Sequence, residues 1–153
     1  MKLYLVQHGE ALDKKLDPQR PLSESGHEDV VNIAAFLAGR VQVSRVLHSG
    51  KMRAQQTAEV LGKFLAQDCE VSEMSGLNPL DSVTSFAEEI TNTGSDALVV
   101  GHLPFMEKLV AVLVSGSEEQ NLIAFRPGSI VCLVGEKKGN WQLEWMIRPE
   151  LLR

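Results

Sequence analysis

The sequence predicts an α/β protein, a three-layer α/β/α sandwich around a mainly parallel central sheet. Short apolar runs, such as residues 3–6 and 97–100, alternate with longer segments in which apolar residues recur every three or four positions. Strands that alternate with helices favour right-handed crossovers, which place helices on both faces of a parallel sheet. No linker, repeat or low-complexity run divides the chain, so we expect one domain over residues 1–153.

The first half of the chain holds two strand-to-helix units. Residues 3–6 predict the first strand, and Ser23 precedes a helical pattern that Gly39 ends. Residues 43–48 predict the second strand, and a second helix with an apolar stripe follows it. A short strand is expected near Val71.

The second half continues the alternation. A polar loop over 75–81 leads to a helical pattern over 82–91, and the apolar strand 97–100 follows. Pro104 suits the start of the next helix, because proline has a helical φ and the first helical position needs no N–H partner. The strand-to-helix pattern therefore occurs a third time.

The chain closes with a predicted hairpin. Residues 129–134 and 141–147 form two strand-like segments, and the glycine–asparagine pair at 139–140 is a turn signal between them. We expect this hairpin to supply an antiparallel edge to the sheet. Trp141 and Trp145 lie four positions apart, so they are expected to cover the same face.

Composition and charge narrow the class of protein. The formal net charge is -5, whereas affinity for a nucleic-acid backbone comes mainly from dense Lys and Arg. No apolar stretch approaches the roughly 20 residues that span a bilayer, and no signal peptide is recognisable, so a cytoplasmic protein is expected. Cys69 and Cys132 form no motif and are expected to be reduced thiols.

Residues with functional chemistry follow three of the predicted strands. His8 follows the first strand, Arg53 lies near the start of the helix after the second, and His102 follows the third. Because the carboxyl ends of parallel strands meet at one edge of a sheet, we expect these side chains to converge. The first turns of a helix favour an anion, and a guanidinium matches two phosphate oxygens. The sequence therefore predicts a phosphate site at this edge.

This set of residues suits phosphoryl transfer through a phosphohistidine. His8 would attack phosphorus with one neutral ring nitrogen, while the other nitrogen donates a hydrogen bond that fixes the tautomer. Protonated His102 and Arg53 would hold the phosphoryl oxygens, and water would then release phosphate. No cofactor is expected, and no metal, since no His-x-x-x-His or cysteine cluster accompanies these histidines.

An ordered set of motifs extends over nearly the whole chain. The motifs are Gln7-His8-Gly9-Glu10-Ala11, Arg20-Pro21-Leu22-Ser23-x-x-Gly26, Ser49-Gly50-Lys51-Met52-Arg53-Ala54-x-Gln56-Thr57, Leu77-Asn78-Pro79 and Gly101-His102-Leu103-Pro104. With them the chain resembles the histidine phosphatase superfamily, which includes phosphoglycerate mutases and acid phosphatases, and is similar to its short SixA-type phosphohistidine phosphatases. The resemblance implies a phosphoglycerate mutase-like fold. It also implies that His8 is the phosphorylated nucleophile and that Arg53 and His102 bind the phosphoryl group.

The third motif departs from the family at Gly50, where a proline is usual, and the first departs at Gln7, where an arginine is usual. One permanent charge and one bidentate fork are lost, although the amide can still donate a hydrogen bond to phosphate. Arg20 is the first choice for a replacement cation, because its Arg-Pro-Leu segment resembles one beside the phosphate site of SixA-type proteins. Arg126 and Lys51 come next. The expected phosphate-binding set is therefore Gln7, Arg20, Arg53 and His102.

The general acid is not evident in the sequence. Glu10 and Asp81 are the nearest carboxylates by motif position, with Ser49 as a further residue at the site, but a surface carboxylate is the alternative for each acid. A phosphoramidate needs less acid assistance than a phosphate ester, because imidazole leaves more readily than an alkoxide. His48 is expected to support the site or make a partly buried polar contact, and His27 is expected to face solvent.

These observations predict a phosphatase that acts on protein phosphohistidine. A short chain without a long capping insertion leaves a shallow pocket, which admits a histidine displayed on another protein. A small-molecule phosphomonoesterase is an alternative. A phosphate- or phosphoprotein-binding module with little turnover is the rival from another class, because Gln7 replaces the arginine. The expected partner is a phosphorylated histidine-containing protein or a small phosphorylated substrate, with no nucleic acid and no membrane.

Overall fold

The computed structural model describes residues 1–136 and 140–153, so part of the turn predicted at 139–140 lies outside the described residues. Within the described ranges, the strands form one sheet in the order β3-β2-β4-β1-β5-β6. The strands are β1 (Lys2–Gln7), β2 (Val46–His48), β3 (Val71–Glu73), β4 (Ala97–Gly101), β5 (Ile130–Val134) and β6 (Gln142–Ile147).

The strand directions confirm the predicted mainly parallel sheet. Strands β3, β2, β4 and β1 pair in parallel, each with its neighbour. Strand β5 runs antiparallel to β1, and β6 runs antiparallel to β5 at the edge of the sheet. The carboxyl ends of β1, β2 and β4 therefore lie along one edge, and the loop that enters β5 reaches the same edge.

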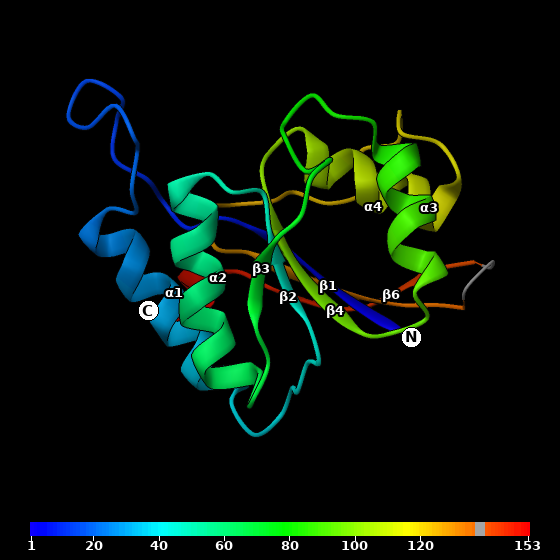
Figure 1. Ribbon diagram of the computed structural model, residues 1–153, viewed down its shortest axis with the longest axis horizontal. Helices are drawn as coiled ribbons and strands as arrows, with labels where there is room; N and C mark the ends of the chain where they lie inside the picture. Colours follow the sequence, from blue (N-terminus) through cyan, green and yellow to red (C-terminus); the bar gives the residue numbers. More distant parts are fainter. Residues whose placement is uncertain (137–139) are drawn as a thin grey trace.

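Helices cover both faces of this sheet (Figure 1). Helices α1 (Glu24–Leu37) and α2 (Met52–Leu65) lie on one face, and α3 (Val83–Asn92) and α4 (Phe105–Ser115) lie on the other. A short 3₁₀ helix, η1 (Pro149–Leu152), follows the last strand. This arrangement is the predicted three-layer α/β/α sandwich. Among the described helices, none has the length and apolar character needed to cross a membrane.

Strand β1 is fixed by two hydrophobic cores, one on each face. Leu3 and Leu5 pack into the core beneath α3 and α4, whereas Tyr4 and Val6 pack into the core beneath α1 and α2. Complete burial of a side chain of this size stabilises the fold by about 1.5–3 kcal/mol. Because the strand is buried on both faces, its carboxyl end has a fixed position in the molecule.

The prediction for the two tryptophans is wrong. Trp141 packs in the core beneath α3 and α4, whereas Trp145 packs against the core of the other face. The pairing of β5 with β6 shifts register, since Cys132 pairs with Trp145 but the next residue pairs with Leu143. Glu144 is therefore an extra residue in the ladder, and such a bulge reverses the facing of the residues beyond it.

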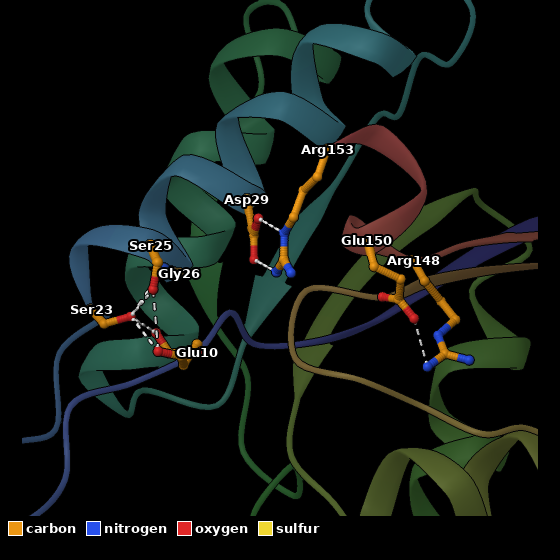
Figure 2. A network of polar contacts seen from close by, with 8 residues as sticks. All are labelled: Glu10, Ser23, Ser25, Gly26, Asp29, Arg148, Glu150 and Arg153. Atoms are coloured by element: carbon orange, nitrogen blue, oxygen red, sulfur yellow. Dashed lines mark hydrogen bonds and ion pairs between the residues drawn. The ribbon is translucent and has the colours of Figure 1, made fainter.

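Helix α1 begins at a tight contact with the segment after β1 (Figure 2). Ser23 is the N-cap, as its position predicts, and its hydroxyl accepts a hydrogen bond of 3.0 Å from the Gly26 N–H. The Glu10 carboxylate accepts hydrogen bonds from the hydroxyls of Ser23 and Ser25 at 3.1 and 3.2 Å. A Cβ on Gly26 would collide with the backbone of Glu10. Glycine is therefore required where α1 meets this segment.

An ion pair between a buried carboxylate and an exposed guanidinium ties the same helix to the last residue of the chain. The Arg153 guanidinium donates to both oxygens of the Asp29 carboxylate, at 3.0 and 2.5 Å. Figure 2 shows this bidentate pair beside the surface pair of Arg148 and Glu150, whose charged atoms are 2.7 Å apart. Asp29 is buried, so the pair satisfies a carboxylate that would otherwise lose its hydration. Helix α1 is thereby held at both its start and its inner face.

We predict that Gly26→Ala lowers the free energy of unfolding by about 1–3 kcal/mol, because the added methyl group must displace the backbone of Glu10. An ordinary glycine-to-alanine change inside a helix has the opposite sign and stabilises by about 1 kcal/mol. Urea denaturation of both proteins measures the difference. Asn32→Ala, at an exposed position of α1, is the control and should change stability by no more than about 0.5 kcal/mol. Equal stabilisation by both variants would contradict this account of Gly26.

Candidate active site

The backbone of His8 is held between the neighbouring strands. Its N–H donates to the Gly101 carbonyl at 3.1 Å, which continues the pairing of β1 with β4 by one residue. The Gly128 N–H, from the loop before β5, lies 3.0 Å from the carbonyl oxygens of both Gln7 and His8. These bonds give the backbone N–H and carbonyl groups partners where the chain leaves the sheet, and they fix the position of the His8 Cα.

The ring of His8 has a defined protonation state. Its Nδ1 lies 2.7 Å from the Gly9 carbonyl oxygen, which can only accept, so the proton of the neutral ring is on Nδ1. Burial lowers the pKa of His8 to about 4, and the nearby positive charges of Arg53 and Arg20 act in the same direction. At neutral pH the Nε2 atom therefore carries a free lone pair. The Arg53 Nε–H donates toward this atom at 3.3 Å.

Thr57 connects the loop after β1 to the start of α2. Its hydroxyl donates to the Arg53 carbonyl at 2.8 Å and accepts from the Gly9 N–H at 3.0 Å, and the side chain is fully buried. A Cβ on Gly9 would come within 2.8 Å of a Val30 methyl group, so the close approach requires glycine. Thr57 has no predicted role, although its position one helical turn after Arg53 places both on one helix face and is the signal in the sequence that indicates such a contact.

His102 is the second imidazole at this edge. Its ring centroid lies 5.1 Å from that of His8, with 51° between the ring planes, and the residue is 2% exposed. Burial, followed by the charges of His8 and Arg53, lowers the pKa of His102 to about 3. In the free protein this ring is therefore neutral, whereas the prediction of a protonated His102 concerns the site with a phosphoryl group bound. Its Nε2 lies 2.5 Å from the Ser49 hydroxyl.

The electrostatics of the site separate the three candidate cations. The charge of Arg20 lowers the pKa of His8, Arg53 and His102, whereas Lys51 acts on His102 among these three groups. Arg20 has a φ of 48°, and its Nε–H donates to the Leu12 carbonyl at 3.1 Å. No such effect arises from Arg126, which lines a surface hollow that also contains Glu10, Asp29 and Arg153. Arg20 is therefore the additional cation that the geometry favours.

The two candidate acids already have hydrogen-bond partners away from the imidazoles. Glu10 is exposed and binds the hydroxyls at the start of α1, and Asp81 accepts a hydrogen bond of 2.8 Å from the Asn78 N–H. Neither carboxylate contributes to the pKa shifts of His8 and His102. Neither of these two candidate carboxylates therefore serves the two imidazoles in the described structure.

The remaining candidate residues, Gln7, His48 and His27, differ in burial and in hydrogen bonding. Gln7 is 8% exposed, and its Oε1 is buried without a hydrogen-bond partner among the described residues. His48 is buried, and its Nδ1 accepts from the Gly50 N–H at 3.0 Å, so it makes a local polar contact. His27 is exposed, as expected. In the part of the chain that the structure describes, no cluster of three or more His, Cys, Asp or Glu residues could hold a metal ion.

The three-layer sandwich, with a neutral His8 at the end of β1 and Arg53 in the first turn of α2, has the phosphoglycerate mutase-like fold. The sequence matches the family described as Histidine phosphatase superfamily (branch 1) over residues 3–82. It is 31% identical to the Phosphohistidine phosphatase SixA of Escherichia coli (strain K12), over 97% of this chain and 94% of that protein. The chain therefore belongs to the histidine phosphatase superfamily.

Solved structures agree with this membership. The protein histidine phosphatase SixA complexed with tungstate superimposes with a TM-score of 0.87 at 31% identity, and the match covers 100% of both chains. A structure described as a putative phosphohistidine phosphatase SixA from Nakamurella multipartitia gives a TM-score of 0.77 at 25% identity, over 97% of this chain and 95% of that one. These relatives support phosphatase chemistry of the histidine phosphatase type.

We predict that the free energy of unfolding falls as the pH is lowered from about 6.5 to about 4. In the unfolded chain a histidine has a pKa near 6.5, whereas His8 titrates at about 4 and His102 at about 3 in the folded protein. The unfolded state thus binds protons first as the pH falls, and each group removes up to about 1.4 kcal/mol per pH unit in this window.

Urea denaturation at a series of pH values measures this dependence. His8→Asn and His102→Asn should each reduce the slope of stability against pH, because each removes one histidine whose pKa is lower in the folded than in the unfolded state. His27→Asn, at an exposed position, is the matched control and should leave the slope unchanged. A wild-type slope retained in both active-site variants would show that other groups cause the effect.

Proposed function

We propose that this chain is a phosphatase that hydrolyses protein phosphohistidine through a phosphorylated intermediate on His8. The observation that supports this proposal is the state of the His8 ring. Its Nδ1–H is bound by the Gly9 carbonyl and its Nε2 is unprotonated, with a guanidinium donor 3.3 Å away. A neutral, oriented imidazole beside a cation is a suitable nucleophile for a phosphoryl group.

In the first proposed step, His8 Nε2 attacks the phosphorus of the substrate. The bond between phosphorus and the substrate imidazole breaks, its electron pair passes to the leaving nitrogen, and that nitrogen takes a proton from water. Arg53 and His102 hold the phosphoryl oxygens, and the Gln7 amide N–H and the Arg20 charge assist them. A water molecule then attacks phosphorus, the bond to Nε2 breaks, and phosphate and neutral His8 are released.

A phosphoramidate substrate is consistent with the positions of Glu10 and Asp81, the two candidate acids among the described residues, away from the imidazoles. Imidazole is a better leaving group than an alkoxide and needs no carboxylate to protonate it during departure. Glu10 binds the start of α1, Asp81 binds within its own loop, and neither acts on the imidazoles. These observations favour protein phosphohistidine over the alternative of a small phosphomonoester.

The surface around the site also supports a protein substrate. Leu16 is 76% exposed in the loop after β1, and Leu80 is 88% exposed in the loop after β3. Both loops extend from the same edge of the sheet (Figure 1). The second loop packs beside the end of β4, where the Leu77 carbonyl lies 4.0 Å from the place that a Cβ on Gly101 would occupy. Exposed apolar side chains on loops at the same sheet edge as the cationic centre suit a protein that carries a phosphoryl group.

A second function, phosphate or phosphoprotein binding with little turnover, is favoured by Gln7. This residue offers a neutral amide where the superfamily usually has a guanidinium, and its buried Oε1 cannot donate to an anion. Loss of one such donor in comparable sites costs about 2.7–4 kcal/mol of transition-state stabilisation. The Arg20 charge, which acts on all three central groups, supports the enzyme instead.

Phosphate release from a phosphorylated histidine phosphotransfer domain tests the proposed function. Wild type should release phosphate, His8→Ala should not, and His27→Ala, at an exposed position, should behave as wild type. Gln7→Arg should raise the rate of release by about tenfold or more, because it adds a charged donor. Release only from Gln7→Arg would establish the binding module, and equal release from wild type and His8→Ala would remove His8 from its role.

Substitution of the two exposed leucines, Leu16 and Leu80, tests whether the substrate is a protein or a small molecule. We expect Leu16→Ser with Leu80→Ser to raise KM for the phosphorylated domain about tenfold, because apolar contact with the partner is lost. Hydrolysis of phosphoramidate itself should not change, since that substrate is too small to reach either loop. The control is Leu143→Ser, an exposed position on β6 near the far end of the sheet. Unchanged KM for the phosphorylated domain would contradict the docking role of the leucines.

A further inference from the structure

Ser49 makes a short contact with the second imidazole of the site. It follows β2, and its Oγ lies 2.5 Å from His102 Nε2. The Lys51 N–H points to the same oxygen at 3.4 Å, so the hydroxyl already receives one weak hydrogen bond. A hydroxyl that accepts from a backbone N–H still has its own proton to donate. His102 Nε2 is the acceptor within reach.

The other nitrogen of His102 is unpartnered. Its Nδ1 is buried and has no hydrogen-bond partner among the described residues. Because the ring is neutral in the free protein, one nitrogen carries the proton and the other accepts. If Ser49 donates to Nε2, the ring proton resides on Nδ1, and a donor is left over for a ligand. Either tautomer leaves the buried Nδ1 without a partner in the free protein, but only the Nδ1–H tautomer offers an N–H to an anion.

The backbone holds Ser49 in this place. Gly50 has a φ of 89°, a conformation that favours glycine, and a Cβ there would collide with the Glu73 carboxylate. The Gly50 N–H also donates to His48 Nδ1 at 3.0 Å. Proline, which the superfamily usually has at this position, is fixed near a φ of −65° and could not adopt this geometry. The turn at Gly50 therefore sets the direction in which the Ser49 hydroxyl approaches His102.

We infer that Ser49 is a positioning residue that donates its hydroxyl proton to His102 Nε2 and thereby keeps the Nδ1–H tautomer ready to bind a phosphoryl oxygen. The hydrogen bond itself is independent of turnover, whereas its use in catalysis rests on the proposed function. Ser49 does not touch the phosphoryl group in this scheme. Its effect passes through the orientation and the tautomer of the His102 ring, in the way that neighbouring hydrogen bonds usually fix a histidine tautomer.

Nitrogen-15 NMR of the histidine side chains tests the tautomer directly. Wild-type protein at pH 7.5 should show His102 with its proton on Nδ1, and Ser49→Ala should show a mixture of both tautomers. Ser49→Thr retains the hydroxyl and should retain the wild-type spectrum. Ser95→Ala, an exposed serine at the opposite end of β4, is the matched control. A wild-type ring with its proton on Nε2, or a Ser49→Ala spectrum identical to wild type, would overturn the inference.

Phosphate release from the phosphorylated domain then measures the consequence. Ser49→Ala should lower kcat/KM by about tenfold, the effect of losing one hydrogen bond to the site, and Ser49→Thr should restore most of it. A tautomer change without a change in kcat/KM would overturn the role of Ser49 in catalysis. Failure of wild type to turn over would instead refute the proposed function, and the NMR result would still decide the tautomer.

Discussion

The geometry of this site depends on the Thr57 hydroxyl, which bonds the Gly9 N–H and the Arg53 carbonyl at once. The first bond holds the chain where it leaves β1, and the second holds the first turn of α2. His8 and Arg53 are 45 residues apart in the sequence, and their contact requires both backbones to keep a fixed separation. A fully buried hydroxyl is well suited to this task, because breaking either bond would leave a buried polar group unpaired.

The same burial that fixes these side chains also removes their charge. His8 and His102 are both neutral in the free protein, since burial is the largest cause of each lowered pKa. Permanent charge at the site therefore comes from Arg53, with contributions from Arg20 and Lys51. In the proposed mechanism this division is useful, because a neutral His8 can attack phosphorus while the arginines offset the charge of the phosphoryl oxygens. A dianion bound here would raise the pKa of His102 and strengthen its donor character.

The sequence was sufficient to predict the convergence of His8, Arg53 and His102, because the carboxyl ends of parallel strands share one edge of a sheet. It could not predict the charge of His102, which depends on burial by residues distant in sequence. It ranked Arg20 above Arg126 by resemblance alone, whereas the structure supplies an electrostatic reason. The predicted sheet face of Trp145 was wrong for a related reason. A single bulge in β6 reverses the alternation of side chains that the sequence pattern assumes.

The two departures from the family pattern act on different properties of the site, the charge around the phosphoryl group and the shape of one turn. Gln7 replaces a permanent charge by an amide, and Gly50 replaces proline in the turn that brings Ser49 to His102. Gln7 thus places a neutral N–H donor where a charged one is usual, whereas the change at Gly50 removes no charge. A neutral donor stabilises the phosphoryl oxygens less than arginine does, in the transition state as well as in the bound substrate. In the proposed enzyme the charge that acts where His8 attacks therefore comes from Arg53.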